Sequence, residues 1–311
     1  MRQLVRSQNA YRLLETANAA GKLSHAYLLT LDDEKILRPF LKECATLFFN
    51  EDKAERIIRE TFSDCLIFPK ENGKFMVEDA ERIIEESALK PIESTRKLFV
   101  ITDFSKATAA AQNKLLKLLE EPPQGVYFLI GATSPFSVLP TVLSRLKQME
   151  IPPFSAGQVA EYFKRNRTYP EKQKPFVSAC AEICGGKVGL TEKFLKEGLY
   201  EPLIEDCQRL LLEGEQKLSK NVKKACELET KKYLFPALSL IFKDALLIKS
   251  SLFETTLTNE RFWIKKVAEK FSKRALIFAQ KQISISEKEL FFNAPMEQCL
   301  QVCLANIYSH A

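Results

Sequence analysis

Carboxylates follow two of the apolar runs in the first third of the chain. Asp32, Asp33 and Glu34 come after the run AYLLT, and Asp103 comes after the run LFVIT. At the start of a helix such carboxylates can cap free backbone N–H groups and offset the helix dipole. They would also repel a bound anion, by about 1 kcal/mol or more for each close pair of charges. Asp103 could instead polarise a water molecule, but a cap at a strand end is the simpler interpretation.

Cysteine and histidine are the next residues whose chemistry depends on spacing. No two cysteines have the two-residue spacing typical of zinc sites. The closest pairs lie four residues apart, which places both thiols on one face of a helix, and we expect that face to be buried. His25 precedes an apolar run and lacks a metal-spaced partner, so we expect a packed or capping side chain. The sequence predicts no metal site. The cysteines are Cys44, Cys65, Cys180, Cys184, Cys207, Cys226, Cys299 and Cys303.

Short apolar runs alternate with helical patterns in the first half of the chain. The runs are nearly continuous, which is typical of strands covered on both faces. Between them, apolar residues recur at spacings of three and four, and the pattern from Ala109 to Glu121 stops at Pro122–Pro123. This order predicts a parallel five-stranded sheet with helices on both faces, although residues 61–73 fit an edge strand or a loop. The runs are Ala26–Thr30, Cys65–Phe68, Leu98–Thr102, Val126–Ala132 and Gln148–Ile151.

The character of the chain changes after Ile151. Pro152–Pro153 marks a boundary, and short helical patterns with a break at Gly185–Gly186 follow it. From about Leu199 to the end, the pattern is helical throughout. We therefore expect three domains. They are an α/β domain at 1–151, a small helical domain at 152–198 and an all-helical domain at 199–311.

The composition fits a helix-rich globular protein. Hydrophobic residues make up 46% and charged residues 28%, which excludes disorder along the whole chain. The net charge of +6 permits a polyanion partner without requiring one. The N-terminal residues do not resemble a signal peptide, and no apolar run reaches the roughly 18 residues that a membrane span needs. We expect a cytoplasmic protein with reduced thiols and no membrane contact.

Four segments carry a resemblance to a known family. The combination of LLKLLEEPP at 115–123 with LPTVLSR at 139–145 is specific, and LSHAYLL at 23–29 and NAPMEQCL at 293–300 add to it. Together they resemble the clamp-loader branch of the AAA+ ATPases, and most of all the delta-prime subunits of bacterial DNA polymerase III clamp loaders. The resemblance implies an AAA+-like domain, a small helical lid domain and a helical collar domain.

The resemblance also makes several departures informative. The family's phosphate loop needs glycines, a lysine and a Ser or Thr, but no glycine occurs from Leu31 to Asn72. By the same resemblance, Thr102 and Asp103 stand at the family's metal-binding acid pair. A Thr cannot anchor Mg²⁺ as a carboxylate does. The four-cysteine zinc module of many relatives is reduced to two cysteines. The resemblance therefore implies a degenerate nucleotide site at Asp32, Asp33, Glu34, Thr102 and Asp103, without ATP, Mg²⁺ or Zn²⁺.

Ser144–Arg145 matches the family's arginine finger, which enters the ATP site of a neighbouring subunit. A planar, permanently charged guanidinium suits charge that spreads over a γ-phosphate. Leu146 follows where the family commonly has Cys, and this change could alter the aim of the finger. The resemblance further implies that the helix opened by Lys106 and Thr108 contacts DNA phosphates, while a solvated helix face is the alternative.

We expect from these features a non-catalytic, delta-prime-like subunit of a clamp-loading assembly. Its implied partners are delta-like and gamma/tau-like subunits, and through them the sliding clamp and primer–template DNA. Two alternatives stay open. One is an active gamma/tau-like AAA+ ATPase with a drifted loop, and the other is a stand-alone nucleic-acid-binding protein.

Overall fold

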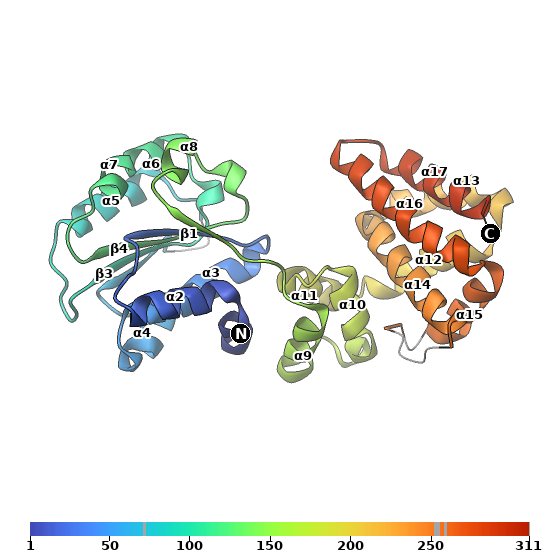
Figure 1. Ribbon diagram of the computed structural model, residues 1–311, viewed down its shortest axis with the longest axis horizontal. Helices are drawn as coiled ribbons and strands as arrows, with labels where there is room; N and C mark the ends of the chain where they lie inside the picture. Colours follow the sequence, from blue (N-terminus) through green and yellow to red (C-terminus); the bar gives the residue numbers. More distant parts are fainter. Residues whose placement is uncertain (71–72, 252–255, 258–259, 311) are drawn as a thin grey trace. The chain divides into compact units, whose positions relative to one another are not determined.

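The computed structural model describes residues 1–70, 73–251, 256–257 and 260–310 of the 311-residue chain (Figure 1). The chain divides into two compact units, Met1–Pro153 and Phe154–Ala311. The finer division into three domains, with boundaries after residues 151 and 198, stays a prediction.

The first unit is built on one sheet of five parallel strands in the order β2-β3-β4-β1-β5. This confirms the predicted α/β fold with a parallel five-stranded sheet. β1 lies between β4 and β5, so that Thr30 is in register with Ala132 on one side and Glu150 on the other. The strands are β1 (Ala26–Thr30), β2 (Cys65–Phe68), β3 (Lys97–Ile101), β4 (Val126–Ala132) and β5 (Lys147–Glu150).

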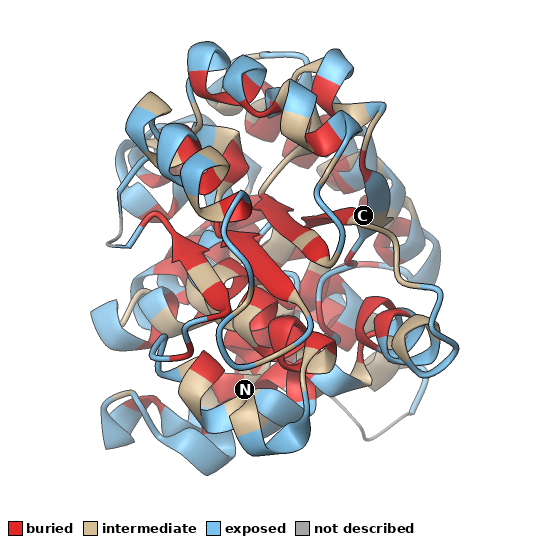
Figure 2. Cartoon of the chain, turned by 90° about the vertical axis from the view of Figure 1, so that its left-hand side faces the viewer, coloured by how far each residue is buried: buried red, intermediate tan, exposed pale blue. Residues whose placement is uncertain are grey.

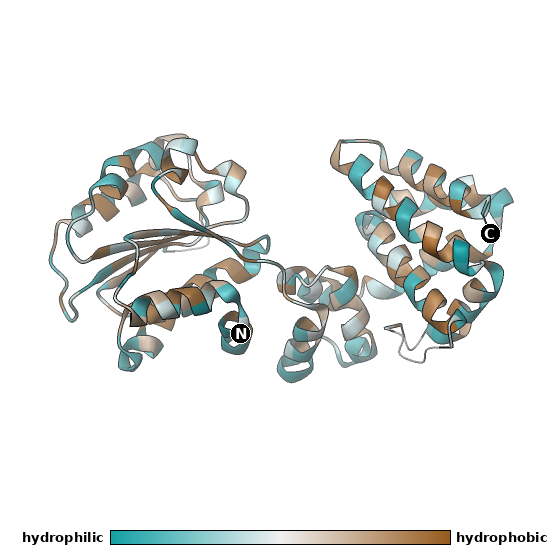
Figure 3. Ribbon diagram, viewed as in Figure 1, coloured by the Kyte–Doolittle hydropathy of each residue, from teal (hydrophilic) through white to brown (hydrophobic). Residues whose placement is uncertain are grey.

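Continuous burial explains why the strand sequences do not alternate. Every residue of β1 and β3 is buried, and Figure 2 shows the sheet as a nearly unbroken red band between its helices. Phe99 of β3 stacks on Phe128 of β4, with ring centroids 5.6 Å apart. Such strands must be covered on both faces, because each face carries apolar side chains. In Figure 3 the inner strands of the sheet are mostly hydrophobic brown.

Helices cover both faces of this sheet (Figure 1). One face carries α2 (Asn9–Ala19), α3 (Glu34–Ala45) and α4 (Ala54–Ile58), with the short α1 (Arg2–Ser7) beside them. The other carries α5 (Val77–Ser87), α6 (Ala109–Lys114), α7 (Leu116–Glu120) and α8 (Pro140–Leu143).

The helix predicted from Ala109 to Glu121 is interrupted. The amide of Leu115 bonds to the carbonyl of Gln112, three residues back, at 3.2 Å. This tight turn separates α6 from α7 and leaves the Leu115 side chain fully buried in the core.

The second unit is helical throughout its described residues. Its predicted break at Gly185–Gly186 is present, since both glycines have positive φ, of 60° and 74°. A Cβ on Gly186 would lie 1.7 Å from the carbonyl oxygen of Phe154, so a side chain cannot fit there. No helix in the described part of the chain is long and apolar enough to cross a bilayer. The helices are α9 (Ala156–Asn166), α10 (Val177–Ile183), α11 (Val188–Glu197), α12 (Tyr200–Leu212), α13 (Leu218–Glu227), α14 (Leu234–Lys249), α15 (Arg261–Lys270), α16 (Lys273–Phe291) and α17 (Met296–Tyr308).

Candidate functional site

The carboxyl ends of β1, β3 and β4 meet at one edge of the sheet, because the three strands are parallel neighbours. Thr102 follows β3 there, and it is buried. Its amide and its hydroxyl both donate to the carbonyl oxygen of Phe68, at 2.8 and 3.2 Å. Thr102 therefore joins the ends of β3 and β2, and its hydroxyl is already committed to the backbone.

The acidic residues after β1 lie at the start of α3, as predicted. Asp33 occupies the N-cap position and Glu34 is the first helical residue. The predicted capping bond is wrong for Asp33, whose side chain accepts no hydrogen bond from the first turn of α3. A cap needs a side-chain oxygen that accepts from the N–H of the second or third helical residue, and Asp33 makes no such bond. The negative charges still lie where the helix dipole favours them.

Lys106 brings the two acidic strand ends together. It lies in η3 (Phe104–Lys106), directly after β3, and forms an ion pair with Glu34 at the start of α3. Its Nζ also lies 3.4 Å from Oδ2 of Asp103. The hydrogen bond to Glu34, more than the charge of Asp103, raises the pKa of Lys106. A lysine thus lies between carboxylates from the ends of β1 and β3.

Asp103 has the capping role that the sequence predicts. Its Oδ1 accepts from the amide of Ser105 at 3.1 Å, which starts η3. Its Oδ2 is buried and accepts no hydrogen bond from the described residues, although Lys106 is close enough for an ion pair. The side chain is 13% exposed. Asp103 is therefore held mainly by charge on one oxygen and by a backbone hydrogen bond on the other.

Ser105 joins this cluster to the end of β4. Its hydroxyl oxygen accepts from the amide of Thr133 at 2.7 Å and lies 3.0 Å from the Thr133 hydroxyl. A weaker bond comes from the amide of Ser134 at 3.4 Å. The polar ends of β3 and β4 are thus connected by side chains of this chain.

The two candidate DNA-contact residues have structural partners. Lys106 pairs with Glu34 and Asp103, and Thr108 caps α6 by accepting a hydrogen bond from the amide of Ala111 at 3.2 Å. To bind a DNA phosphate, Lys106 would have to give up its ion pairs with these two carboxylates. Contact with DNA by Lys106 and Thr108 stays a prediction.

Arg145 lies two residues beyond α8 and is anchored on its own chain. Its Nη2 donates to Oε2 of Glu120 at 2.9 Å, and its Nη1 donates to the carbonyl of Thr141 at 2.7 Å. Ser144 contributes a longer contact to Nη1, at 3.4 Å. The side chain is 29% exposed, so the guanidinium lies at the surface but is not extended into solvent. Leu146 is buried in the core, and an effect of this residue on the aim of Arg145 stays a prediction.

The cysteines and His25 lie in structural surroundings. All eight cysteines are free thiols, and all but Cys226 are buried. Burial raises the pKa of Cys303 to about 11 and of Cys184 to about 12. Nε2 of His25 lies 3.0 Å from the carbonyl of Leu119, to which it can donate, so His25 joins LSHAYLL to LLKLLEEPP. The described residues contain no group of three or more side chains arranged for a metal ion.

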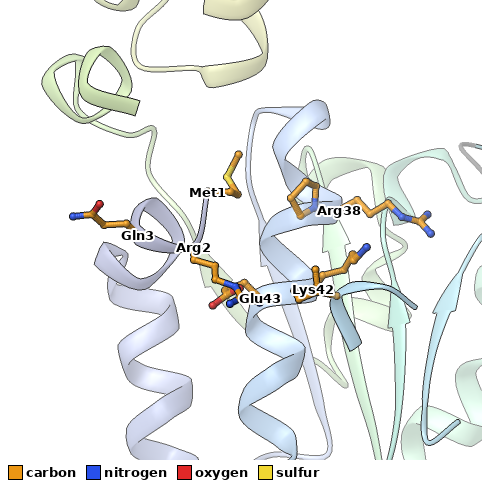
Figure 4. A pocket seen from close by; sticks show the side chains of 8 residues that line it. Met1, Arg2, Gln3, Arg38, Lys42 and Glu43 are labelled. Carbon is orange, nitrogen blue, oxygen red and sulfur yellow. The ribbon is translucent and has the colours of Figure 1, made fainter. Parts of the chain in front are cut away.

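A separate cavity of about 530 Å³ lies between α1, α3 and the end of α4 (Figure 4). Its cations are already paired, since Arg2 lies 3.4 Å from Glu43, and Arg38 and Lys42 both bond Glu60. The lining does not include the Glu34–Lys106–Asp103 cluster. It consists of Met1, Arg2, Gln3, Arg38, Pro39, Lys42, Glu43 and Ile58.

Comparison with known proteins relates most of the first unit to one protein family. Residues 6–155 match the family model described as DNA polymerase III, delta subunit. Over these residues the chain is similar to clamp-loader-type subunits of DNA polymerase III. The match covers all five strands and both segments of the LLKLLEEPP–LPTVLSR pair, and it confirms the resemblance of this domain to clamp-loader subunits.

Individual relatives match only part of the chain. A DNA polymerase III gamma/tau subunit from Mycobacterium tuberculosis is 35% identical over 69 residues, which are 22% of this chain and 12% of the relative. A gamma subunit from Buchnera aphidicola is 27% identical over 149 residues, covering 41% of this chain and 40% of the relative. The chain thus spans less than half the length of these relatives. A gamma subunit-related protein from Thermotoga maritima has a TM-score of 0.42 at 17% identity, covering 96% of this chain and 99% of that chain.

Sequence reasoning located the strand ends but missed three of the connections between them. The resemblance implies a DNA contact for Lys106, with a solvated helix face as the alternative, although its position three residues after Asp103 places it within reach of that carboxylate. Ser105 and Glu120 carried no pattern that points to their partners. Their roles depend on contacts 28 and 25 residues away along the chain.

Proposed function

We propose that this chain is a delta-prime-like, non-catalytic subunit of a DNA polymerase III clamp loader. It would form a hetero-oligomer with delta-like and gamma/tau-like subunits and present Arg145 to the ATP site of a neighbour. Through that assembly it would act on a sliding clamp and on primer–template DNA. The family of residues 6–155 supports membership of such a complex.

The observation that carries the non-catalytic assignment is the Glu34–Lys106–Asp103 cluster. In the family, a triphosphate and its Mg²⁺ would need the space beyond β1 and β3. Here that edge carries a lysine paired with carboxylates from both strand ends. No glycine lies between Leu31 and Asn72 to let the backbone approach a phosphate. A triphosphate would have to break the ion pairs of Lys106 and approach three acidic residues after β1.

A gamma/tau-like ATPase is the second candidate, because the relatives described above are gamma or gamma/tau subunits. The two functions differ in whether the chain itself binds ATP. Equilibrium titration of the purified chain with a fluorescent ATP analogue and Mg²⁺ separates them. We expect no saturable binding, and micromolar affinity would overturn the non-catalytic assignment.

Co-purification tests the membership of a complex. The full-length native chain, isolated from its own cells under mild conditions, should elute with gamma/tau-like and delta-like subunits. In that complex, Arg145→Ala should leave assembly intact and lower ATP turnover, because a finger supplied in trans is worth about 10³–10⁵ in rate in other systems. Unchanged turnover in the assembled complex would refute the finger assignment.

A further inference from the structure

The contact between Arg145 and Glu120 joins the two motifs that carry the family resemblance. Glu120 is the last residue of α7, within LLKLLEEPP, and Arg145 ends LPTVLSR. Their side chains meet at 2.9 Å, between Oε2 and Nη2. The side chain of Glu120 is 58% exposed, whereas the side chain of Arg145 is 29% exposed. Glu120 therefore covers part of Arg145 while remaining largely in solvent itself.

The guanidinium is incompletely satisfied in this arrangement. Nη1 has the carbonyl of Thr141, and Nη2 has Glu120, but Nε is buried and has no acceptor among the described residues. Nε and Nη2 form the edge of an arginine that binds planar or tetrahedral oxyanions through two parallel hydrogen bonds. Glu120 engages that edge through one of its oxygens only. An acceptor with two suitably spaced oxygens would satisfy both nitrogens.

We propose that Glu120 is a holding residue for Arg145, which it retains on its own chain until a phosphoryl group of a neighbour's nucleotide replaces it. This inference rests on the proposed function, because it assigns a resting state to the same arginine. The exchange costs little free energy. The exposed Glu120 carboxylate returns to water, and the phosphoryl oxygens supply the acceptor that Nε lacks. Thr141 keeps Nη1 in place during the exchange, so the guanidinium turns about a fixed contact.

The strength of the hold is limited by the exposure of Glu120. Ion pairs with one largely exposed partner contribute about 0.2–1 kcal/mol. Removing the charge of Glu120 should therefore make Arg145 about 1.4- to fivefold more available. Glu120→Gln retains the size of the side chain and an oxygen acceptor. Glu121→Gln is the matched control, since Glu121 is the adjacent residue and is not a bond partner of Arg145.

The hold can be measured on the full-length chain without partners. Phenylglyoxal modifies accessible guanidinium groups, and peptide mass spectrometry gives the rate at Arg145 alone. We expect Arg145 to react about 1.4- to fivefold faster in Glu120→Gln than in the wild type, and at the wild-type rate in Glu121→Gln. Equal rates in Glu120→Gln and the wild type would overturn the holding role.

ATP turnover in the assembled complex then distinguishes two roles for Glu120, which either retains Arg145 on its own chain or orients it toward the neighbour's nucleotide. If Glu120 holds Arg145 back, Glu120→Gln should lower the ATP concentration for half-maximal turnover about 1.4- to fivefold. The double variant Glu120→Gln/Arg145→Ala should behave as Arg145→Ala. Slower turnover in Glu120→Gln, with Arg145→Ala also slow, would overturn the holding role and make Glu120 an aiming residue. Unchanged turnover in Arg145→Ala would instead refute the finger itself, while the phenylglyoxal rates still decide whether Glu120 retains Arg145.

Discussion

Replacing Lys106 with methionine removes the cation between Glu34 and Asp103 but keeps a side chain of similar length. The pair with Glu34 is exposed, with 39% of Lys106 and 65% of Glu34 accessible, so its loss should cost about 0.2–1 kcal/mol. Asp103 is 13% exposed and would lose its nearby cation. Losing one partner of a fully buried pair costs about 3–5 kcal/mol, and we expect about 1–2 for this partly exposed one. Lys106→Met should therefore destabilise the first unit by about 1–3 kcal/mol.

The two units can be followed separately during urea unfolding. Trp263 is the single tryptophan, and it is buried in the second unit, so its fluorescence reports that unit. Far-UV circular dichroism reports both. In Lys106→Met, the unfolding transition of the first unit, seen by circular dichroism but not by tryptophan fluorescence, should shift to a lower urea concentration. The transition reported by Trp263 should not shift.

A control and a rescue make the test specific. Lys114 pairs with Glu81 at 2.9 Å, with 45% and 50% of the two side chains exposed, so Lys114→Met should cost less than about 1 kcal/mol. Adding Asp103→Asn to Lys106→Met should recover most of the loss, because it removes the uncompensated charge and keeps an acceptor for Ser105. A loss in Lys106→Met no larger than in Lys114→Met would refute the reasoning that this cluster stabilises the strand ends.

Three further predictions concern the frame around the site. In Asp64→Ala, three backbone N–H groups lose acceptors at 2.6 to 2.8 Å, so thermal unfolding should show a loss of about 3 kcal/mol or more. In Gly131→Ala, the new methyl would lie 2.5 Å from a leucine methyl and 2.9 Å from a backbone carbonyl oxygen, so about 1–3 kcal/mol should be lost in urea unfolding. Burial alone would raise the pKa of Glu60, but hydrogen bonds from Arg38 and Lys42 outweigh it and lower the pKa. A lowered folded-state pKa gives stability that is present above the unfolded value of about 4.3 and is lost as the pH falls through the folded value. The stability difference between the wild type and Glu60→Gln should therefore shrink below about pH 4.

The fold of the first unit was largely predictable because its signal is local. Buried strands must be nearly continuous apolar runs, so their positions were visible in the sequence to within about one residue. The break of the helix at Leu115 was not visible, since the apolar spacing on both sides of it is helical. That turn depends on how Leu115 packs in the core, which no local pattern records.

The candidate site was predictable only in part. The sequence located the acidic residues after β1 and β3, because residue types at strand ends can be read directly. It did not show that Lys106 pairs with Glu34, 72 residues away, or that Glu120 bonds Arg145. Such pairings depend on which strand ends become neighbours and on the rotamers of long side chains. The wrong prediction of a capping bond for Asp33 has the same origin. The sequence placed Asp33 correctly at the start of the helix, but the position of a residue does not fix the direction of its carboxylate.

The bonds of Ser105 to Thr133 and Ser134 have a consequence for signalling within an assembly. A domain that relays the state of its nucleotide needs an element with two alternative arrangements, and ligand binding must favour one of them. Here the polar ends of β3 and β4 are fastened to each other by the chain's own hydroxyl and amide groups. Under the proposed function, that connection would keep the two strand ends together while neighbouring subunits hydrolyse ATP, and the domain would serve them as a constant reference rather than as a switch.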